Sequence, residues 1–281
     1  MKFLLIGSRG FIGQEILLQL IHQGFDVIEL NRSDSDPLGY MNTKALSDIF
    51  ASHSINGVIS AAWTTSQSTY RDSSENFEHQ KATENLALEA RKNAVPIFVS
   101  LGSAAEYGHL NLAATSLSSS LKPVDNYSSA KIATFRALTG IFDSTETLFI
   151  WPRIFQPYGQ GQDRNRFLPS LISSLRSNTK LEINNPGHVY DWINVVDVAK
   201  AIIFSIANRI GGAIDIGTGE GTSNIELANI VSRAIRGIDF ASSSSTDSVI
   251  RGLVMSSNTQ LSNYGWKPEF TLHSSIESLV R

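Results

Sequence analysis

The 281 residues are enough for one large domain or two smaller ones with a sizeable core. A net charge of −3 gives no sign of a nucleic-acid partner, which would need a clustered basic face, and no apolar run reaches the roughly 18 residues of a membrane-spanning helix. The absence of cysteine excludes disulfides, thiolate metal sites and a cysteine nucleophile, and it fits a reducing compartment, so we expect a cytoplasmic protein. The apolar run in MKFLLIG stops at Gly7, too early for a signal peptide.

The first half of the chain alternates between two kinds of segment. Short apolar runs predict buried strands at 3–6, 27–30, 58–62, 97–101 and 147–151. Apolar residues at helical spacing predict helices at 11–23, 44–53, 75–92 and 127–139. This alternation predicts the α/β class, with a Rossmann-type, doubly wound parallel sheet covered on both faces.

After residue 152 prolines and glycines interrupt this rhythm. Helices near 166–177, 195–208 and 223–235 are separated by short strands. We expect a dinucleotide-binding domain at 1–155, to which later segments near 186–217 return. Residues 156–281 would form mainly a smaller C-terminal substrate-binding lobe.

The run GSRGFIG follows the first predicted strand and opens the first helix. Backbone N–H groups at a helix N-terminus bind pyrophosphate, and glycines allow a close approach of the backbone. The spacing is GxxGxxG rather than the GxGxxG of the dinucleotide fingerprint. We expect the whole run to bind the cofactor, that is Gly7, Ser8, Arg9, Gly10, Phe11, Ile12 and Gly13.

The end of the second strand should meet the adenine ribose of this cofactor. An acidic residue there would favour NAD, and an arginine would accommodate the 2′-phosphate of NADP. Asn31 is neutral and Arg32 follows it, which favours NADP(H) and leaves NAD(H) open. Glu29 lies two residues earlier and is expected to point elsewhere.

A tyrosine stands four residues before a lysine in YSSAK, residues 127–131. In order along the chain, GSRGFIG, GSAAEYG (102–108) and YSSAK resemble the motifs of the extended short-chain dehydrogenase/reductase family, in particular its nucleotide-sugar branch of epimerases, dehydratases and ketoreductases. Further similar segments are PRIFQPYGQGQ (152–162), YDWINVVDVAKAI (190–202), AIDIGTGEGTSNIELA (213–228) and YGWKPEF (264–270). The resemblance covers nearly the whole chain.

The resemblance implies that Ser103, Tyr127 and Lys131 are the catalytic set. Residues four apart share a helix face, and a nearby ammonium should lower the pKa of the tyrosine towards neutrality. Ser103 would orient the reacting oxygen, and Lys131 would also bind the nicotinamide ribose. The resemblance further implies cofactor contacts at Ala61, Ala62, Leu101, Pro152, Arg153 and Ile154.

Two alanines restrict the choice among the reactions of this family. The 4,6-dehydratases of this family carry acidic residues after the catalytic serine or threonine, whereas this chain has Ala104 and Ala105, and Glu106 should point differently. Two reactions are left: a 4-ketoreductase that consumes NADPH with Tyr127 as general acid, and a 4-epimerase that retains NAD. Arg32 favours the reductase. A non-catalytic protein that senses NADP(H) is a third alternative, which the intact Tyr–Lys pair opposes.

The substrate is expected to be a nucleotide-linked sugar, although a smaller carbonyl compound stays open. The family's diphosphate-binding arginine is replaced by Tyr190, and its asparagine by Gln156. Arg251 could supply a second diphosphate-binding arginine, and His188 or Arg164 could compensate. The expected substrate-binding residues are Thr64, Ser103, Ala104, Tyr127, Gln156 and Arg251.

Other polar residues are expected to play no part in chemistry. His79, His109 and His188 lack metal-ligand spacing, so no metal site is expected. Asp191, Trp192 and Asp197 are expected to be structural. The resemblance also implies a homodimer that pairs through helices 75–92 and 127–140.

Overall fold

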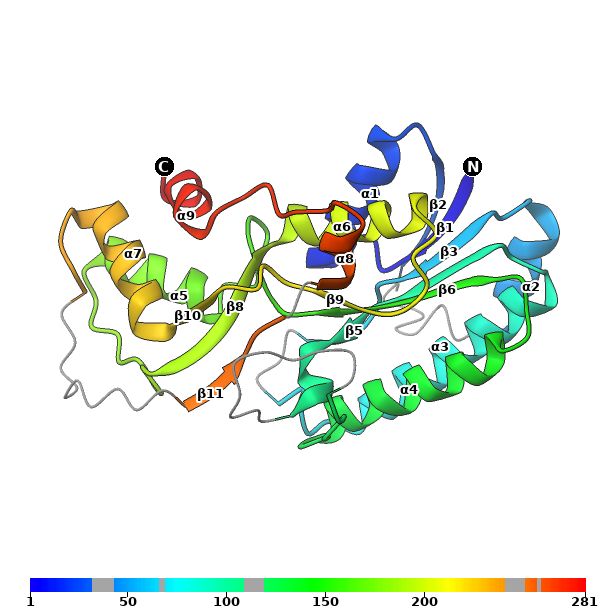
Figure 1. The fold of residues 1–281 in the computed structure, drawn as a ribbon, viewed down its shortest axis with the longest axis horizontal. Coiled ribbons are helices and arrows are strands. Elements are labelled where there is room, and N and C mark those ends of the chain that lie inside the picture. Colours follow the sequence, from blue (N-terminus) through cyan, green and yellow to red (C-terminus); the bar gives the residue numbers. More distant parts are fainter. Residues whose placement is uncertain (32–42, 66–68, 109–118, 241–250, 257–258) are drawn as a thin grey trace. The chain divides into compact units, whose positions relative to one another are not determined.

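The structure is a computed structural model that describes residues 1–31, 43–65, 69–108, 119–240, 251–256 and 259–281 (Figure 1). The chain divides into two compact units. The first contains 1–108, 120–154 and 199–214, and the second contains 155–198 and 215–281. The sequence analysis placed the domain boundary at residue 155 and a returning segment near 186–217.

The first unit is built on a seven-stranded sheet with the order β2-β1-β3-β4-β6-β5, in which β9 also pairs with β6. Every pair along this order is parallel, which confirms the predicted Rossmann-type α/β fold. The strands are β1 (Lys2–Ile6), β2 (Asp26–Leu30), β3 (Gly57–Ser60), β4 (Ile97–Ser100), β5 (Gly102–Ser103), β6 (Leu148–Ile154) and β9 (Gly212–Ile216).

Helices cover both faces of this sheet, because its central strands are apolar throughout and need cover on both sides. Helices α3 and α4 lie side by side on one face, and α1 lies on the other (Figure 1). One core cluster joins Leu4, Val58 and Phe98 of the strands to Leu86 of α3 and Leu138 of α4. The helices are α1 (Phe11–His22), α2 (Thr43–Ser52), α3 (Glu75–Lys92), η2 (Ala104–Tyr107), α4 (Asn126–Phe142) and α6 (Val195–Ala207).

The second unit has its own four-stranded sheet and its own core. Its strand order is β10-β8-β11, and β7 also pairs with β8. Its core gathers Tyr158, Leu171, Trp192, Leu227 and Ile276. The elements are β7 (Gln156–Tyr158), α5 (Phe167–Ser177), β8 (His188–Asn194), β10 (Gly221–Ser223), α7 (Asn224–Arg236), β11 (Arg251–Val254), α8 (Thr259–Asn263) and α9 (Leu272–Val280).

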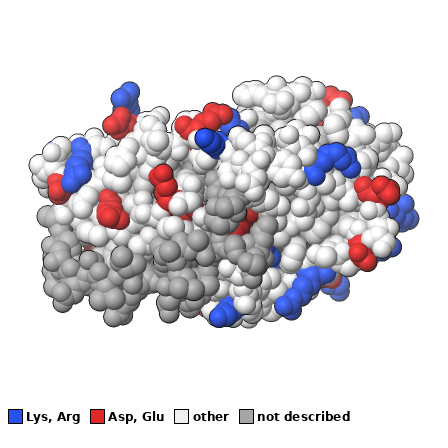
Figure 2. All heavy atoms as spheres, in the orientation of Figure 1, with Lys and Arg blue, Asp and Glu red and all other residues white. Residues whose placement is uncertain are grey.

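The visible surface mixes both signs of charge. On the face shown in Figure 2, lysines and arginines are interspersed with aspartates and glutamates, without a continuous basic area among the described residues. None of the described helices is long and apolar enough to span a bilayer.

The parallel order brings the expected site residues to one edge of the first sheet. The carboxyl ends of β1, β3 and β4 are followed by Gly7, Ala61 and Leu101. Parallel sheets bind ligands at this edge.

Candidate active site

The glycine run forms a tight cradle between β1 and α1. Gly7 has a φ of +83°, and its backbone lies so close to the end of β3 that an added Cβ would be 2.8 Å from the backbone of Ala62. At Gly13 an added Cβ would lie 2.0 Å from the carbonyl oxygen of Gly7. The N-cap of α1 is Gly10, which offers no side-chain cap. This N-terminus fits the pyrophosphate of a dinucleotide, as the sequence predicts.

The end of β2 corrects the expectation for Glu29. The Ser8 hydroxyl donates to Glu29 Oε2 at 2.5 Å and accepts from Asn31 Nδ2 at 2.8 Å. The N–H of Arg9 donates to Asn31 Oδ1 at 3.3 Å. Glu29 therefore points at the glycine loop rather than away from it, and the end of the strand is tied to the same loop by the Gly7 N–H, which donates to the Leu30 carbonyl at 3.0 Å. Arg32 lies outside the described residues.

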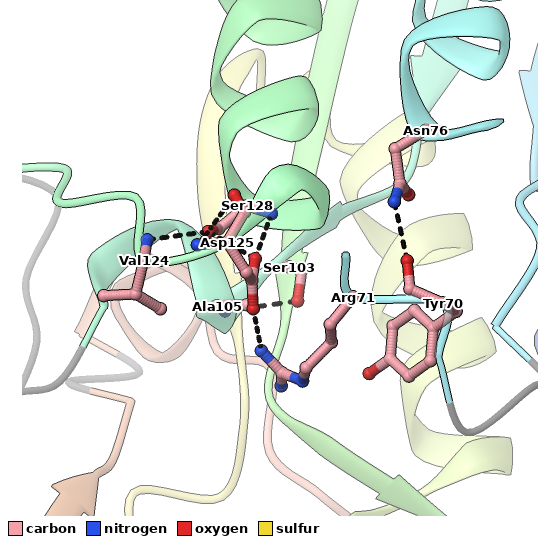
Figure 3. Close-up of polar contacts among 8 residues, drawn as sticks. All are labelled: Tyr70, Arg71, Asn76, Ser103, Ala105, Val124, Asp125 and Ser128. Atoms are coloured by element: carbon pink, nitrogen blue, oxygen red, sulfur yellow. Dashed lines mark hydrogen bonds and ion pairs between the residues drawn. The ribbon is translucent and has the colours of Figure 1, made fainter. Parts of the chain in front are cut away.

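Ser103 is held by a buried carboxylate. Its side chain accepts from the N–H of Ala105 at 3.2 Å (Figure 3), and its own N–H donates to Glu106 Oε1 at 2.8 Å. Ser103 and Glu106 thus form the capping box of η2, a pattern that the sequence displays as S-x-x-E. Glu106 is 0% exposed and accepts from Trp151 Nε1 at 3.0 Å and from Arg153 Nε at 2.8 Å.

The side chain of Arg153, a predicted cofactor-binding residue, is part of this network. Its guanidinium is buried, paired with Glu106, and lies over the rings of Tyr107 and Phe135. The pair raises the pKa of Arg153 against the opposing effect of burial. Arg153 supports Ser103 through Glu106, and its backbone is left for the predicted cofactor contact, beside Pro152 and Ile154 of the same strand end.

Tyr127 lies in the first turn of α4, which Asp125 caps. Asp125 Oδ1 accepts from the N–H of Ser128 at 2.7 Å, and the N–H of Tyr127 donates to the carbonyl of Arg71 at 2.8 Å. The phenol ring of Tyr127 lies nearly perpendicular to the ring of Tyr70, with centroids 5.2 Å apart, and to that of Trp63, with centroids 6.2 Å apart.

The direction of the pKa shift of Tyr127 differs from the expectation. Burial raises its pKa well above the ordinary value, Tyr70 adds to this effect, and a hydrogen bond with Ser103 opposes it. The sequence predicted a lowered pKa from the neighbouring ammonium. In the structure the Lys131 Nζ is 5.8 Å from the centroid of the Tyr127 ring and is engaged elsewhere. Burial therefore favours the neutral form of the Tyr127 phenol.

Lys131 is buried, with 4% of its surface exposed. Its Nζ donates to the carbonyl of Leu101 at 2.7 Å and lies 3.5 Å from the ring centroid of Trp63. Burial lowers the pKa of Lys131 to about 7, against the charge of Glu106, which raises it. The structure thus brings together Leu101 and Lys131, two predicted cofactor-binding residues, and adds Trp63, which the sequence analysis did not name.

The segment before α3 also lies against Tyr127. Arg71 Nη1 donates to Asp125 Oδ2 at 2.6 Å, and Asn76 Nδ2 donates to the carbonyl of Tyr70 at 2.6 Å (Figure 3). Arg71 lowers the pKa of Tyr127 and Tyr70 raises it. Of this segment the sequence analysis named only Thr64, because aromatic and basic residues in a loop form no motif.

Thr64 is tied to a buried histidine. Its N–H donates to His79 Nε2 at 3.2 Å, and its hydroxyl lies 3.0 Å from the same nitrogen. The ring of His79 stacks on Trp63 with centroids 5.3 Å apart. No cluster of three metal-binding side chains occurs among the residues with described positions. Ala104 is buried in η2, beside Ser103.

The remaining expected substrate residues belong to the second unit. Gln156 lies in β7 opposite Trp192, and Arg251 lies in β11 opposite His188. The Tyr190 hydroxyl is 3.5 Å from Nδ1 of His188. Their part in substrate binding stays a prediction.

Asp191 has the structural role that the sequence analysis expected. It is fully buried and accepts from the N–H groups of Thr218 and Gly219 at 2.7 and 2.9 Å, and from that of Ser256 at 3.0 Å. Asp197 likewise accepts from the N–H groups of Glu269 and Phe270. Both carboxylates fasten loops of the second unit.

The chain is similar to known enzymes over most of its length. It is 23% identical over 312 residues to a UDP-glucose 4-epimerase of Lacticaseibacillus casei, covering 96% of this chain and 92% of the relative. A dTDP-L-rhamnose 4-epimerase of Burkholderia thailandensis is 25% identical over 166 residues, which are 56% of this chain and 46%, less than half, of that relative.

The fold is similar to solved structures as well. The structure of the Thermus thermophilus UDP-glucose 4-epimerase complex with NAD has a TM-score of 0.85 at 20% identity, and the match covers 100% of this chain and 98% of that one. The profile of the NAD dependent epimerase/dehydratase family matches residues 3–217. With its glycine cradle and its Ser103–Tyr127–Lys131 set in place, the chain belongs to the NAD dependent epimerase/dehydratase family.

Proposed function

We propose that the protein is a nicotinamide-dependent 4-ketoreductase that acts on a nucleotide-linked sugar. The observation that carries this proposal is the buried phenol of Tyr127, whose pKa burial raises, beside Ser103. A phenol with a raised pKa holds its proton at neutral pH, and reduction of a ketone needs a proton donor at the reacting oxygen.

The residues divide the work of such a reduction. Ser103, fixed by Glu106, positions the carbonyl oxygen of the substrate, and Tyr127 donates its proton to that oxygen. Lys131 in its ammonium form stabilises the resulting phenolate. A bound nicotinamide would supply the hydride. Ala104 and Ala105 offer no proton-transfer group, which argues against dehydration.

A 4-epimerase with retained NAD is the second candidate, and Glu29 favours it. The carboxylate at the end of β2 lies on the glycine loop, where it would accept ribose hydroxyls and repel a 2′-phosphate. The NADP(H) preference predicted from Arg32 and the NAD preference supported by Glu29 therefore lead to opposite reactions.

Replacing Glu29→Gln separates these two cofactor preferences. If the carboxylate repels the 2′-phosphate, the variant binds NADPH about tenfold more tightly or better, while its affinity for NADH changes little. Glu84→Gln on α3 is the matched control. Cofactor affinities are measured by titration of nicotinamide fluorescence, and equal changes for both cofactors would contradict this role of Glu29.

The reaction itself is tested by following nicotinamide absorbance with NADPH or NADH and a panel of nucleotide-linked 4-keto-6-deoxyhexoses. The reductase predicts net oxidation of the cofactor with one of these sugars. No net oxidation, together with tightly bound NAD in the purified protein and interconversion of unmodified nucleotide sugars, would establish the epimerase instead.

We also propose a homodimer that pairs through α3 and α4. Both helices lie side by side on one face of the sheet, and α3 exposes the apolar Phe77 and Leu88. Sedimentation velocity decides between a monomer and this dimer.

A further inference from the structure

Trp63 lies in the site although no sequence motif points to it. It follows Ala61 and Ala62 at the end of β3, and the backbone of these alanines abuts the glycine loop at Gly7. Trp63 is therefore on the ligand-binding edge of the sheet. It follows the alanines that contact the glycine cradle, and its ring lies against Tyr127 and Lys131 of α4.

The indole is held in place through its nitrogen and its ring. Trp63 Nε1 donates to Asn76 Oδ1 at 2.8 Å, and Asn76 is buried with its Nδ2 donating to the carbonyls of Tyr70 and Ser73 at 2.6 and 2.9 Å. The ring of His79 stacks on the indole at an interplanar angle of 26°. These contacts from α3 and the loop before it fix the plane of the indole.

This fixed plane faces the Lys131 ammonium. Lys131 Nζ is 3.5 Å from the ring centroid of Trp63, closer than it is to the rings of Tyr127 at 5.8 Å and Trp151 at 6.0 Å. A cation over an aromatic face is attracted by the ring quadrupole, and the attraction is strongest for tryptophan and for desolvated cations. Lys131 meets both conditions.

Few other groups support the ammonium. Its Nζ donates to the Leu101 carbonyl, and the negative charge that acts on it is that of Glu106 in η2, which is itself paired with Arg153. Among the described residues, Tyr127 lies on the same helix with its ring centroid 5.8 Å from Nζ, Tyr70 packs against Tyr127, and His79 of α3 stacks on Trp63. A buried lysine with so little compensation depends on each favourable contact.

We propose that Trp63 is a positioning residue: its indole binds the Lys131 ammonium in a cation–π contact that keeps the lysine charged and holds its Nζ at 5.8 Å from the ring centroid of Tyr127. This inference rests on the proposed function, because Lys131 matters to catalysis only if Tyr127 transfers the proton. Trp63 acts through Lys131: its indole N–H donates to Asn76, and its ring meets that of Tyr127 at right angles with centroids 6.2 Å apart.

The first test needs no cofactor and no turnover. Lysine ¹³Cε chemical shifts are followed against pH in the wild type, in Trp63→Phe and in Trp63→Leu, with the Lys131→Met spectrum assigning the signal. Phe keeps an aromatic face and Leu does not. We expect the ratio of ammonium to amine at Lys131, at a given pH, to fall about tenfold in Trp63→Leu and about twofold in Trp63→Phe.

A larger fall of the ammonium-to-amine ratio in Trp63→Leu than in Trp63→Phe supports the cation–π contact. Equal effects would mean that the indole only fills space, and an unchanged titration in Trp63→Leu would overturn the proposal outright. Trp63→Met gives a second flexible, non-aromatic variant should the Leu protein fail to fold. Because this arm measures only Lys131, it stands even if no sugar substrate is turned over.

The second test uses catalysis. In Trp63→Leu the alkaline limb of the kcat/KM profile should move to lower pH, since less ammonium is present at each pH, and activity should recover at the acidic end. Trp63→Phe should restore most of the wild-type profile. A Trp63→Leu protein with an unshifted profile and tighter cofactor binding would instead identify the indole as an obstacle to the cofactor, against the proposal.

Discussion

Replacing Tyr127→Phe should lower turnover by about 10²- to 10⁴-fold, the usual contribution of a positioned general acid. The substitution removes only the hydroxyl and its hydrogen bond with Ser103. Phenylalanine keeps the ring that packs against Tyr70 and Trp63, so the fold and the cofactor cradle should be unaffected. The measurements are steady-state turnover of the keto sugar and cofactor affinity by fluorescence titration.

Tyr70→Phe is the matched control for this experiment. It removes a neighbouring phenol that raises the pKa of Tyr127 but leaves the acid itself in place. We expect its turnover to stay within about tenfold of the wild type. Retained turnover in Tyr127→Phe, with Tyr70→Phe unchanged, would show that another group donates the proton and would sink the mechanism.

Replacing Lys131→Met should abolish most of the activity and yet make the protein more stable at neutral and acidic pH. Burial lowers the pKa of Lys131 from 10.5 to about 7, so the folded state disfavours a charge that the unfolded chain carries freely. Met has a similar length and no charge. The gain in the free energy of unfolding should be on the order of 2–4 kcal/mol at pH 6.

The pH dependence of this gain has a definite sign. Between pH 7 and 10.5 the folded wild type binds fewer protons than the unfolded chain, so its stability rises with pH across this window. The advantage of the Met variant should therefore shrink as pH increases and be smallest near pH 10.5. Urea unfolding at pH 6 and pH 10 measures the difference.

Lys81→Met on α3 serves as the control, because it makes the same chemical change at an exposed position. It should alter the free energy of unfolding by less than about 0.5 kcal/mol at either pH. A Lys131→Met protein that is less stable than the wild type at pH 6 would show the opposite balance. The contacts of the ammonium with Leu101 and Trp63 would then outweigh its burial.

The expected results for Lys131→Met and Tyr127→Phe show how the two buried groups of the site affect the stability of the fold. A buried lysine without a dedicated ion pair destabilises the fold, whereas the neutral phenol beside it fits its apolar surroundings. Sites that need perturbed groups commonly accept such a loss of stability.

The sequence by itself determined the architecture and pointed to the candidate site. Apolar runs and helical spacing predicted the strands and helices of the first unit, with 75–92 matching α3 (Glu75–Lys92) and 11–23 exceeding α1 by one residue. These patterns are local, and burial on a parallel sheet reinforces them. The glycine run and the Tyr127–Lys131 pair could be recognised from their short spacing in the sequence, and Ser103 could be recognised because it lies in the GSAAEYG motif.

Only the tertiary structure decided the partners, the direction and the burial of these side chains. Glu29 meets Ser8 from 21 residues away, Glu106 pairs with Arg153 from 47 residues away, and Trp63 faces a lysine on another helix. Side-chain direction and the degree of burial depend on such long-range packing, which no spacing in the sequence encodes. The pKa of Tyr127 was therefore predicted in the wrong direction: the sequence displayed the nearby lysine, but only the fold removes the phenol from water and turns the ammonium towards Leu101 and Trp63.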